Sequence, residues 1–303
     1  MGGRAPADCS VPLVSIGMPV YNDRRFLRDS IDSLCAQTFK DFELILRDDG
    51  STDGSAEICL DYCARDPRIR YVRNERNLGI SQTMQLLLAE ARGEFFMWAA
   101  DDDLWDESFI ERLVDSLRDA PDCIVSFCPY ALIDEDGVRF GMTRAIDYSA
   151  KWAWQRIIKL ARHWDDGFGY GLFRAADIKS VRFPLWHWVN RERAYNNIYP
   201  TLYFYLARSN FKLVGTEPLW LNRIKTNSHH KIPFEGRFCA RVGAAFLWKA
   251  DVFAASAQGI FNGSRSPLLV IVSLPALICR MMADCNRELL EAFFALKTGK
   301  IEL

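Results

Sequence analysis

The first 130 residues alternate short apolar runs with segments whose apolar residues recur at helical spacing, and this alternation most constrains the fold. The apolar runs lie at residues 13–20, 42–46, 69–72, 94–100 and 123–130. Runs of this length are typical of buried strands, and strands that alternate with helices of about 10–15 residues form right-handed βαβ units. The sequence therefore predicts an α/β fold built on a Rossmann-like, mainly parallel sheet flanked by helices.

Acidic residues gather where two of these strands are predicted to end. Asp48 and Asp49 follow the second apolar run, and three consecutive aspartates at 101–103 follow the fourth. Ligands of open parallel sheets bind beyond the carboxyl ends of the strands, so we expect both clusters to line one site. Adjacent carboxylates repel one another unless they share a cation, and hard oxygen ligands suit Mg²⁺ or Mn²⁺. The alternative is a cap for a helix at 104–117, a role for which Asp106 is better placed.

The loops after the first two strands offer groups that suit a nucleoside. The carboxylate of Asp49 can accept hydrogen bonds from a base or a ribose, although an ordinary strand-to-helix turn at 48–54 explains the same residues. Tyr21 can stack on a flat base or can close the edge of the sheet. Each residue therefore keeps two explanations when it is considered alone.

Three segments, at residues 14–55, 69–81 and 91–114, together resemble the catalytic domain of glycosyltransferase family 2, which has the GT-A fold. The resemblance is close over residues 12–130 and continues more loosely to about residue 230. It implies a metal-dependent, inverting enzyme that uses Mg²⁺ or Mn²⁺ and a nucleoside-diphosphate sugar of UDP, dTDP or GDP. The acceptor it implies is a hydroxyl of a glycan or of a lipid-linked saccharide in the assembly of a cell-surface polysaccharide.

The resemblance also implies roles for individual residues. Asp102 and Asp103 match the acidic pair of the metal motif. Ala100 stands where the family has an Asp that contacts the ribose. In this chain Asp101 takes over that contact, or the contact is lost. The residues implied in nucleotide-sugar binding are Pro19, Tyr21, Asn22, Asp49, Arg76, Asn77, Gly79 and Asp101.

The general base is the least defined of these roles. The family places an Asp or Glu on or just before a helix that follows the strand predicted at 170–174, and Glu192 is the only acid in the segment 191–208. Asp165 and Asp166 are the alternatives. A solvated charge between two arginines explains Glu192 equally well, and a surface turn explains the aspartate pair.

Aromatic residues concentrate in the second half of the chain, where seven of the nine Trp lie between residues 152 and 248. Trp186 and Trp188 can form a platform for an acceptor sugar, or they can pack in a core or a dimer. Arg223 and His229 lie in a stretch that resembles the Arg…His segment after a strand of the family, and the resemblance makes Arg223 the candidate partner of the diphosphate.

The predicted domains are a GT-A domain over residues 1–235 and a helical C-terminal extension over residues 236–303. Within the first, residues 12–130 form the nucleotide-sugar half and residues 131–235 the acceptor half. An amphipathic stretch at 237–253 and the uncharged stretch at 266–279, which is too short to span a bilayer, predict contact with an anionic membrane. The alternatives are packing on the GT-A core or a homodimer.

Composition excludes some functions. The formal net charge of −1, from 38 basic and 39 acidic side chains, argues against a nucleic-acid partner. The nine cysteines form no CxxC pair, and the chain begins without an apolar leader. These features predict a cytoplasmic protein, which can also bind peripherally to the inner face of the cell membrane. Two other functions stay open: an inactive GT-A module that binds or scaffolds, and a sugar-phosphate nucleotidyltransferase, which the absence of a Gly-rich first loop disfavours.

Overall fold

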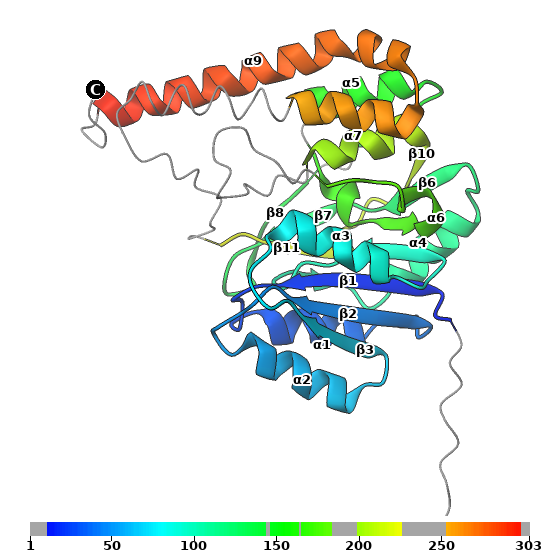
Figure 1. Cartoon of the computed structure of the whole chain (residues 1–303), viewed down its shortest axis with the longest axis vertical. Coiled ribbons are helices and arrows are strands. Elements are labelled where there is room, and N and C mark those ends of the chain that lie inside the picture. The colour runs from blue at the N-terminus through cyan, green and yellow to red at the C-terminus, as the bar shows by residue number, and fades with distance from the viewer. Residues whose placement is uncertain (1–10, 144–145, 164, 184–198, 226–252, 298–303) are drawn as a thin grey trace, which may run out of the picture.

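The computed structural model describes residues 11–143, 146–163, 165–183, 199–225 and 253–297, and its centre is a seven-stranded sheet (Figure 1). The strand order is β10-β6-β9-β4-β1-β2-β3. The strands are β1 (Val14–Val20), β2 (Phe42–Asp48), β3 (Ile69–Arg73), β4 (Phe95–Trp98), β6 (Cys123–Phe127), β9 (Leu172–Arg174) and β10 (Asn210–Leu213). The pairs β4–β1, β1–β2 and β2–β3 are parallel, and β9 runs antiparallel between β4 and β6. The predicted α/β fold with a mainly parallel sheet is confirmed.

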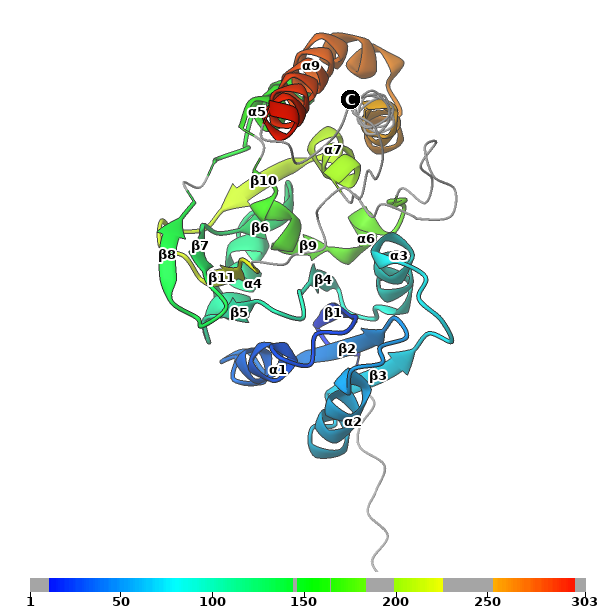
Figure 2. The ribbon, with the colours of Figure 1, turned by 90° about the vertical axis from the view of Figure 1, so that its left-hand side faces the viewer.

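Helices cover both faces of this sheet. α1, α2 and α4 pack in one hydrophobic cluster, and α3, α5 and α7 in another, as the arrangement in Figure 2 shows. The helices are α1 (Leu27–Cys35), α2 (Ser55–Arg65), α3 (Ile80–Glu90), α4 (Phe109–Arg118), α5 (Ala153–His163), α6 (Ala175–Ile178) and α7 (Tyr199–Arg208), with a 3₁₀ turn, η1, at Gly167–Tyr170.

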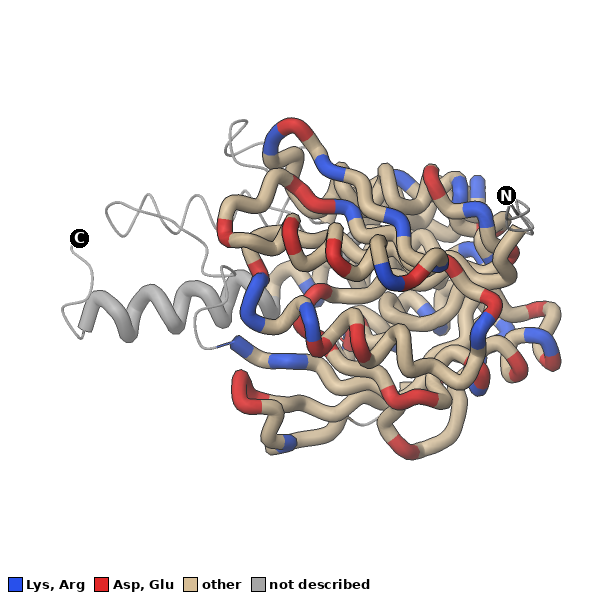
Figure 3. Tube along the Cα trace, turned by 90° about the horizontal axis from the view of Figure 1, so that it is seen from below, with Lys and Arg blue, Asp and Glu red and all other residues tan. Residues whose placement is uncertain are grey.

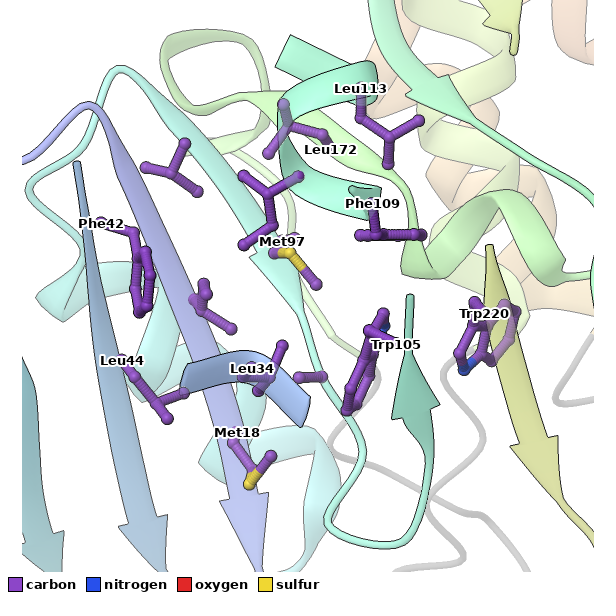
Figure 4. Close-up of a cluster of buried hydrophobic side chains, with 14 of the residues drawn as sticks. Met18, Leu34, Phe42, Leu44, Met97, Trp105, Phe109, Leu113, Leu172 and Trp220 are labelled. Carbon is purple, nitrogen blue, oxygen red and sulfur yellow. The ribbon is translucent and has the colours of Figure 1, made fainter. Parts of the chain in front are cut away.

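Successive side chains of a strand point to opposite faces of the sheet, so one sheet contributes to a hydrophobic cluster on each face. Phe95 and Met97 of β4 belong to the first cluster, whereas Phe96 and Trp98 belong to the second. Figure 4 shows the first cluster, where Met97 lies near Phe109 of α4 and Leu172 of β9. Because β4 is apolar on both faces, its sequence is a continuous apolar run rather than an alternating one.

A second sheet of four strands, in the order β5-β11-β7-β8, lies beside the first. Its strands are β5 (Leu104–Trp105), β7 (Tyr130–Ile133), β8 (Arg139–Met142) and β11 (Trp220–Arg223). The single strand predicted at 123–130 is therefore two strands in different sheets, because Pro129 between them cannot donate a ladder hydrogen bond. The two strands that follow α7 along the chain are likewise divided between the sheets, with β10 in the first and β11 in the second.

The C-terminal part is helical where it is described, at residues 253–264 and in α9 (Pro267–Lys297). The uncharged stretch at 266–279 is not a separate segment, because α9 continues through Pro275 as one helix of 31 residues that packs against α5. None of the helices in the described ranges is long and apolar enough to cross a membrane. The predicted boundary at residue 235 and most of the stretch 237–253 lie outside the described residues.

Basic and acidic side chains are interspersed along the described trace, as Figure 3 shows. This mixture accords with the near-zero net charge of the whole chain.

Candidate functional site

A cleft of about 950 Å³ opens where β1, β2 and β4 of the main sheet end and β11 of the second sheet passes. Its lining comes from the loops after these strands, from the first turns of α3 and from the β7–β8 turn. The predicted residues in this lining are Pro19, Tyr21, Asn22, Asp49, Asn77, Gly79, Asp101, Asp102 and Arg223. Both acidic clusters therefore meet at one site, at the carboxyl ends of parallel strands.

Asp49 positions the loop between β3 and α3. One carboxylate oxygen accepts hydrogen bonds from the Leu78 N–H at 2.8 Å and the Asn74 amide at 2.7 Å, and the other from the Gly79 N–H at 2.8 Å. Gly79 has a φ of 84°, which a side chain would strain. Arg76 lies in this loop but is not among the residues that line the cleft.

The loop after β1 presents Tyr21 at the mouth of the cleft. The side chain of Tyr21 is 49% exposed, so it does not close the sheet edge. Its backbone N–H donates to Asp101 at 3.1 Å, and the Asn22 side chain accepts a hydrogen bond from the Thr52 N–H at 2.8 Å. The loops after β1, β2 and β4 are thus tied together by polar contacts.

Three carboxylates meet at the floor of the cleft: Asp23, Asp101 and Asp102 each place an oxygen within 4.8 Å of the others. Burial raises the pKa of Asp101 well above its usual value, and the charges of Asp23 and Asp102 add to that effect. Mutual repulsion of this kind is relieved by a shared cation, and three hard oxygen donors fit Mg²⁺ or Mn²⁺. The cluster therefore has the donor set that a divalent metal requires.

Asp103, predicted beside Asp102 as a metal ligand, faces the other way. Its carboxylate accepts hydrogen bonds from the Trp220 indole N–H at 2.8 Å and the Arg223 backbone N–H at 2.9 Å, with the Asn222 amide at 3.3 Å. All three donors belong to β11. Asp103 is fully buried, so these bonds fix the acidic loop against the second sheet.

Two cations from the end of β11 reach the same loop. The guanidinium of Arg223 donates to the carbonyl of Asp102 at 2.8 Å and to those of Asp134 and Glu135 at 3.2 Å. The ammonium of Lys225 lies 2.7 Å from the carboxylate of Asp102 and also pairs with Asp23. Arg223 thus braces the acidic loop, whereas Lys225 neutralises part of its charge.

The structure does not place the described candidates for the general base in the cleft. Asp165 accepts a hydrogen bond from the Gly167 N–H at 3.0 Å and another from the Tyr130 hydroxyl, and burial raises its pKa. Asp165 and Asp166 do not line the cleft, whose acids within the described ranges are Asp23, Asp49, Asp101, Asp102 and Glu135. The remaining predicted residues, Glu192, Trp186, Trp188 and His229, lie outside the described part of the chain.

Residues 15–183, more than half of the chain, match the sequence profile of the family described as Glycosyl transferase family 2. The chain belongs to glycosyltransferase family 2. The part that matches contains the loops after β1, β2 and β4, and hence most of the cleft. The family resemblance of the sequence is confirmed.

Individual relatives show how far the similarity extends. Over 126 residues the chain is 40% identical to the uncharacterized glycosyltransferase RT0329 of Rickettsia typhi, covering 41% of this chain and 38% of the relative. It is 33% identical over 126 residues to the putative teichuronic acid biosynthesis glycosyltransferase TuaG of Bacillus subtilis, covering 42% and 50%. The chain thus matches half or less of the length of these two relatives.

The fold is that of a solved glycosyltransferase structure. S. aureus TarS 1–349 in complex with UDP superimposes with a TM-score of 0.58 at 15% identity, over 94% of this chain and 91% of that one. At this identity the likeness establishes the GT-A fold, as predicted, and nothing about the ligand of this chain.

Several residues that line the cleft were not predicted from the sequence. Asp23 directly follows Tyr21 and Asn22, so its place in the same loop is a signal that could have been used. Glu135, Tyr170, Asn222 and Lys225 lie more than 30 residues beyond the acidic loop, and no local pattern connects them to it.

Proposed function

We propose that this chain transfers a sugar, with inversion, from a nucleoside-diphosphate sugar to a hydroxyl of a glycan or lipid-linked saccharide. The observation that carries the proposal is the convergence of Asp23, Asp101 and Asp102 in the same cleft as Tyr21 and Asp49. Carboxylates that can hold a cation suit a diphosphate, and an exposed ring beside them suits a base. The similarity to TuaG supports a role in the assembly of a cell-surface polysaccharide. UDP, dTDP and GDP are the nucleotides to test.

For the donor, we assign Tyr21 to the face of the base and Asp49 to the base or ribose. Pro19 and Asn22 shape the same loop, and Arg76, Asn77 and Gly79 lie in the loop that Asp49 holds. Asp101 stands next to Tyr21, where the Ala100 departure from the family leaves room for it to take the ribose contact.

For the metal, we assign Asp102 and Asp23 as ligands of Mg²⁺ or Mn²⁺. When it is bound, the cation would neutralise the negative charge that develops on the diphosphate as this group leaves the sugar. Asp103, which the sequence groups with Asp102, instead orients the loop through β11. Arg223 braces the same loop through the Asp102 carbonyl.

A carboxylate must accept the proton of the acceptor hydroxyl as it attacks. We propose Glu192 for this role, with Asp165 and Asp166 as alternatives, and we propose Trp186, Trp188 and His229 for contacts with the acceptor. Glu192→Gln should abolish transfer and leave donor affinity nearly unchanged. If activity persists, the same measurement on Asp165→Asn and Asp166→Asn tests the alternatives.

The deciding experiment measures release of nucleoside diphosphate from UDP-, dTDP- and GDP-sugars, with and without Mn²⁺. We expect one donor to turn over in the presence of Mn²⁺, and Asp102→Asn to lose that turnover. Asp119→Asn, on an exposed residue at the end of α4, is the matched control and should behave as wild type. A chain that neither turns over nor binds any donor with Mn²⁺ would instead be an inactive module with a binding or scaffolding role.

We also propose that α9 brings the protein to the inner face of an anionic membrane. Its exposed side chains include Leu268, Ile271, Val272, Ile278 and Met282. Leu268, Ile271, Val272 and Met282 recur at spacings that place them within one arc of the helix, so they form an apolar stripe. Apolar stripes of this kind bind membrane interfaces when basic residues accompany them, and Arg265, which precedes α9, is exposed.

A further inference from the structure

The ammonium of Lys225 lies inside the carboxylate cluster rather than at its edge. It is 2.7 Å from an oxygen of Asp102 and paired with an oxygen of Asp23, and its side chain is only 27% exposed. Asp102 and Asp23 are two of the three carboxylates whose oxygens converge within 4.8 Å. Lys225 therefore contacts the same oxygens that a divalent cation would use.

Two cations cannot share these oxygens without repelling each other at short range. Any divalent metal that binds Asp23 and Asp102 must first displace the ammonium, and the protein loses both ion pairs when it does. A lysine has a long flexible side chain and behaves as a mobile point charge, so it can move without disturbing the backbone.

The other basic residue of the described cleft lining, Arg223, is not free to play this part. Its guanidinium already donates to the carbonyls of Asp102, Asp134 and Glu135, and its side chain stacks on Phe26 with 4.5 Å between guanidinium carbon and ring centroid. Arg223 thus stays in place as a brace. Lys225 is the cation that can exchange partners.

We infer that Lys225 is a resident counter-cation that competes with the divalent metal for Asp23 and Asp102 until a diphosphate arrives. The inference rests on the proposed use of this cluster as the metal site. A diphosphate offers new anionic oxygens to the displaced ammonium and further oxygen ligands to the metal. Metal and nucleotide therefore bind cooperatively, and the empty protein binds metal weakly.

The test is a calorimetric titration of the purified chain with Mn²⁺ alone, with no nucleotide present. Lys225→Met should bind Mn²⁺ at least about tenfold more tightly than wild type, since each tenfold step corresponds to about 1.4 kcal/mol. Lys212→Met, on an exposed residue of β10 at the far edge of the sheet, removes the same charge and should match wild type. Adding UDP should tighten Mn²⁺ binding to wild type far more than to Lys225→Met.

Equal or weaker Mn²⁺ binding by a Lys225→Met protein with a wild-type thermal transition would overturn the inference. A second measurement needs no variant: acylation of lysines followed by mass spectrometry. Saturating Mn²⁺ should increase the modification of Lys225 and leave Lys212 unchanged, whereas protection or no change at Lys225 contradicts displacement. Because neither measurement requires turnover, competition without transfer would count against the proposed function alone.

Discussion

Asp102 and Asp103 are adjacent carboxylates whose side chains do different things. Asp102 faces the cleft and pairs with Lys225, whereas Asp103 is buried and accepts hydrogen bonds from three groups of β11. A buried donor that loses its acceptor lowers the free energy of unfolding far more than the loss of a partly exposed ion pair does. The two residues therefore differ in what their replacement should change.

We predict that Asp103→Asn lowers the free energy of unfolding by about 1–3 kcal/mol, because the amide cannot accept all the hydrogen bonds that the carboxylate accepts. Asp102→Asn should stay within about 1 kcal/mol of wild type and lose Mn²⁺ binding instead. Urea unfolding and metal titration of both variants check the contrast. Equal destabilisation by the two variants would contradict the separate roles.

Tyr21 allows a second prediction at this scale. Stacking of a base on an aromatic ring is worth about 1–3 kcal/mol, so Tyr21→Ala should weaken nucleotide binding by about five- to 150-fold. Tyr21→Phe keeps the ring and should bind as wild type. Phe140→Ala, which removes an exposed ring of β8 that does not line the cleft, is the control. Equilibrium binding of UDP, dTDP and GDP measures the effect.

Among the elements, β2 is secured to the start of β4 by a charge pair. Arg92 donates to Glu43 through two guanidinium nitrogens, at 2.7 and 3.1 Å, and the Ser15 hydroxyl donates to Glu43 at 2.7 Å. Burial alone would raise the pKa of Glu43, but these hydrogen bonds outweigh it and hold the pKa below its usual value. The ionised form is therefore favoured by folding.

A carboxyl group whose pKa is lowered by folding stabilises the protein above its unfolded pKa, and this stabilisation is lost as the pH falls through the folded pKa. We predict that Glu43→Gln lowers the free energy of unfolding by about 1–3 kcal/mol at pH 7. The difference from wild type should shrink as the pH falls below the unfolded-state pKa of about 4.3 and through the lower folded-state pKa, where Glu43 becomes protonated. Chemical unfolding across pH 3–7 provides the measurement, and a difference independent of pH would contradict the assignment.

The elements also show where sequence patterns succeed. The strands β1, β2 and β3 lie within two residues of their predicted bounds, because each is an apolar run bounded by turn residues. The short strands β5, β7 and β11 were missed or merged, since a strand of two to four residues has too little periodicity to detect. These missed strands form the sheet that carries Arg223 into the cleft.

At the scale of the whole molecule, the apolar stripe of α9 is the feature that the proposed catalytic site does not use. We predict that the wild-type chain co-sediments with vesicles rich in phosphatidylglycerol, and that Ile271→Glu with Met282→Glu reduces this binding several-fold. Val138→Glu, which adds a charge at an exposed apolar residue of the β7–β8 turn, is the control.

Light scattering tests whether a second copy of the chain, rather than a membrane, covers the apolar stripe. If the wild-type chain is a dimer that the Ile271→Glu, Met282→Glu variant splits, and vesicle binding is unchanged, the stripe is an interface between two copies. A monomer that binds anionic vesicles and releases them at high salt supports the membrane.

The sequence by itself determined the α/β order of the first 130 residues and the placement of Asp49 and Asp102 at the ends of parallel strands. Both are local properties: a strand or helix reveals itself within its own residues, and a parallel sheet brings the carboxyl ends of its strands to one side. Only the tertiary structure decided that Asp103 turns toward β11 and that Lys225 enters the cluster of Asp23 and Asp102. Such contacts join residues more than a hundred positions apart, and no pattern within a segment specifies which distant side chains the packing of two sheets will bring together.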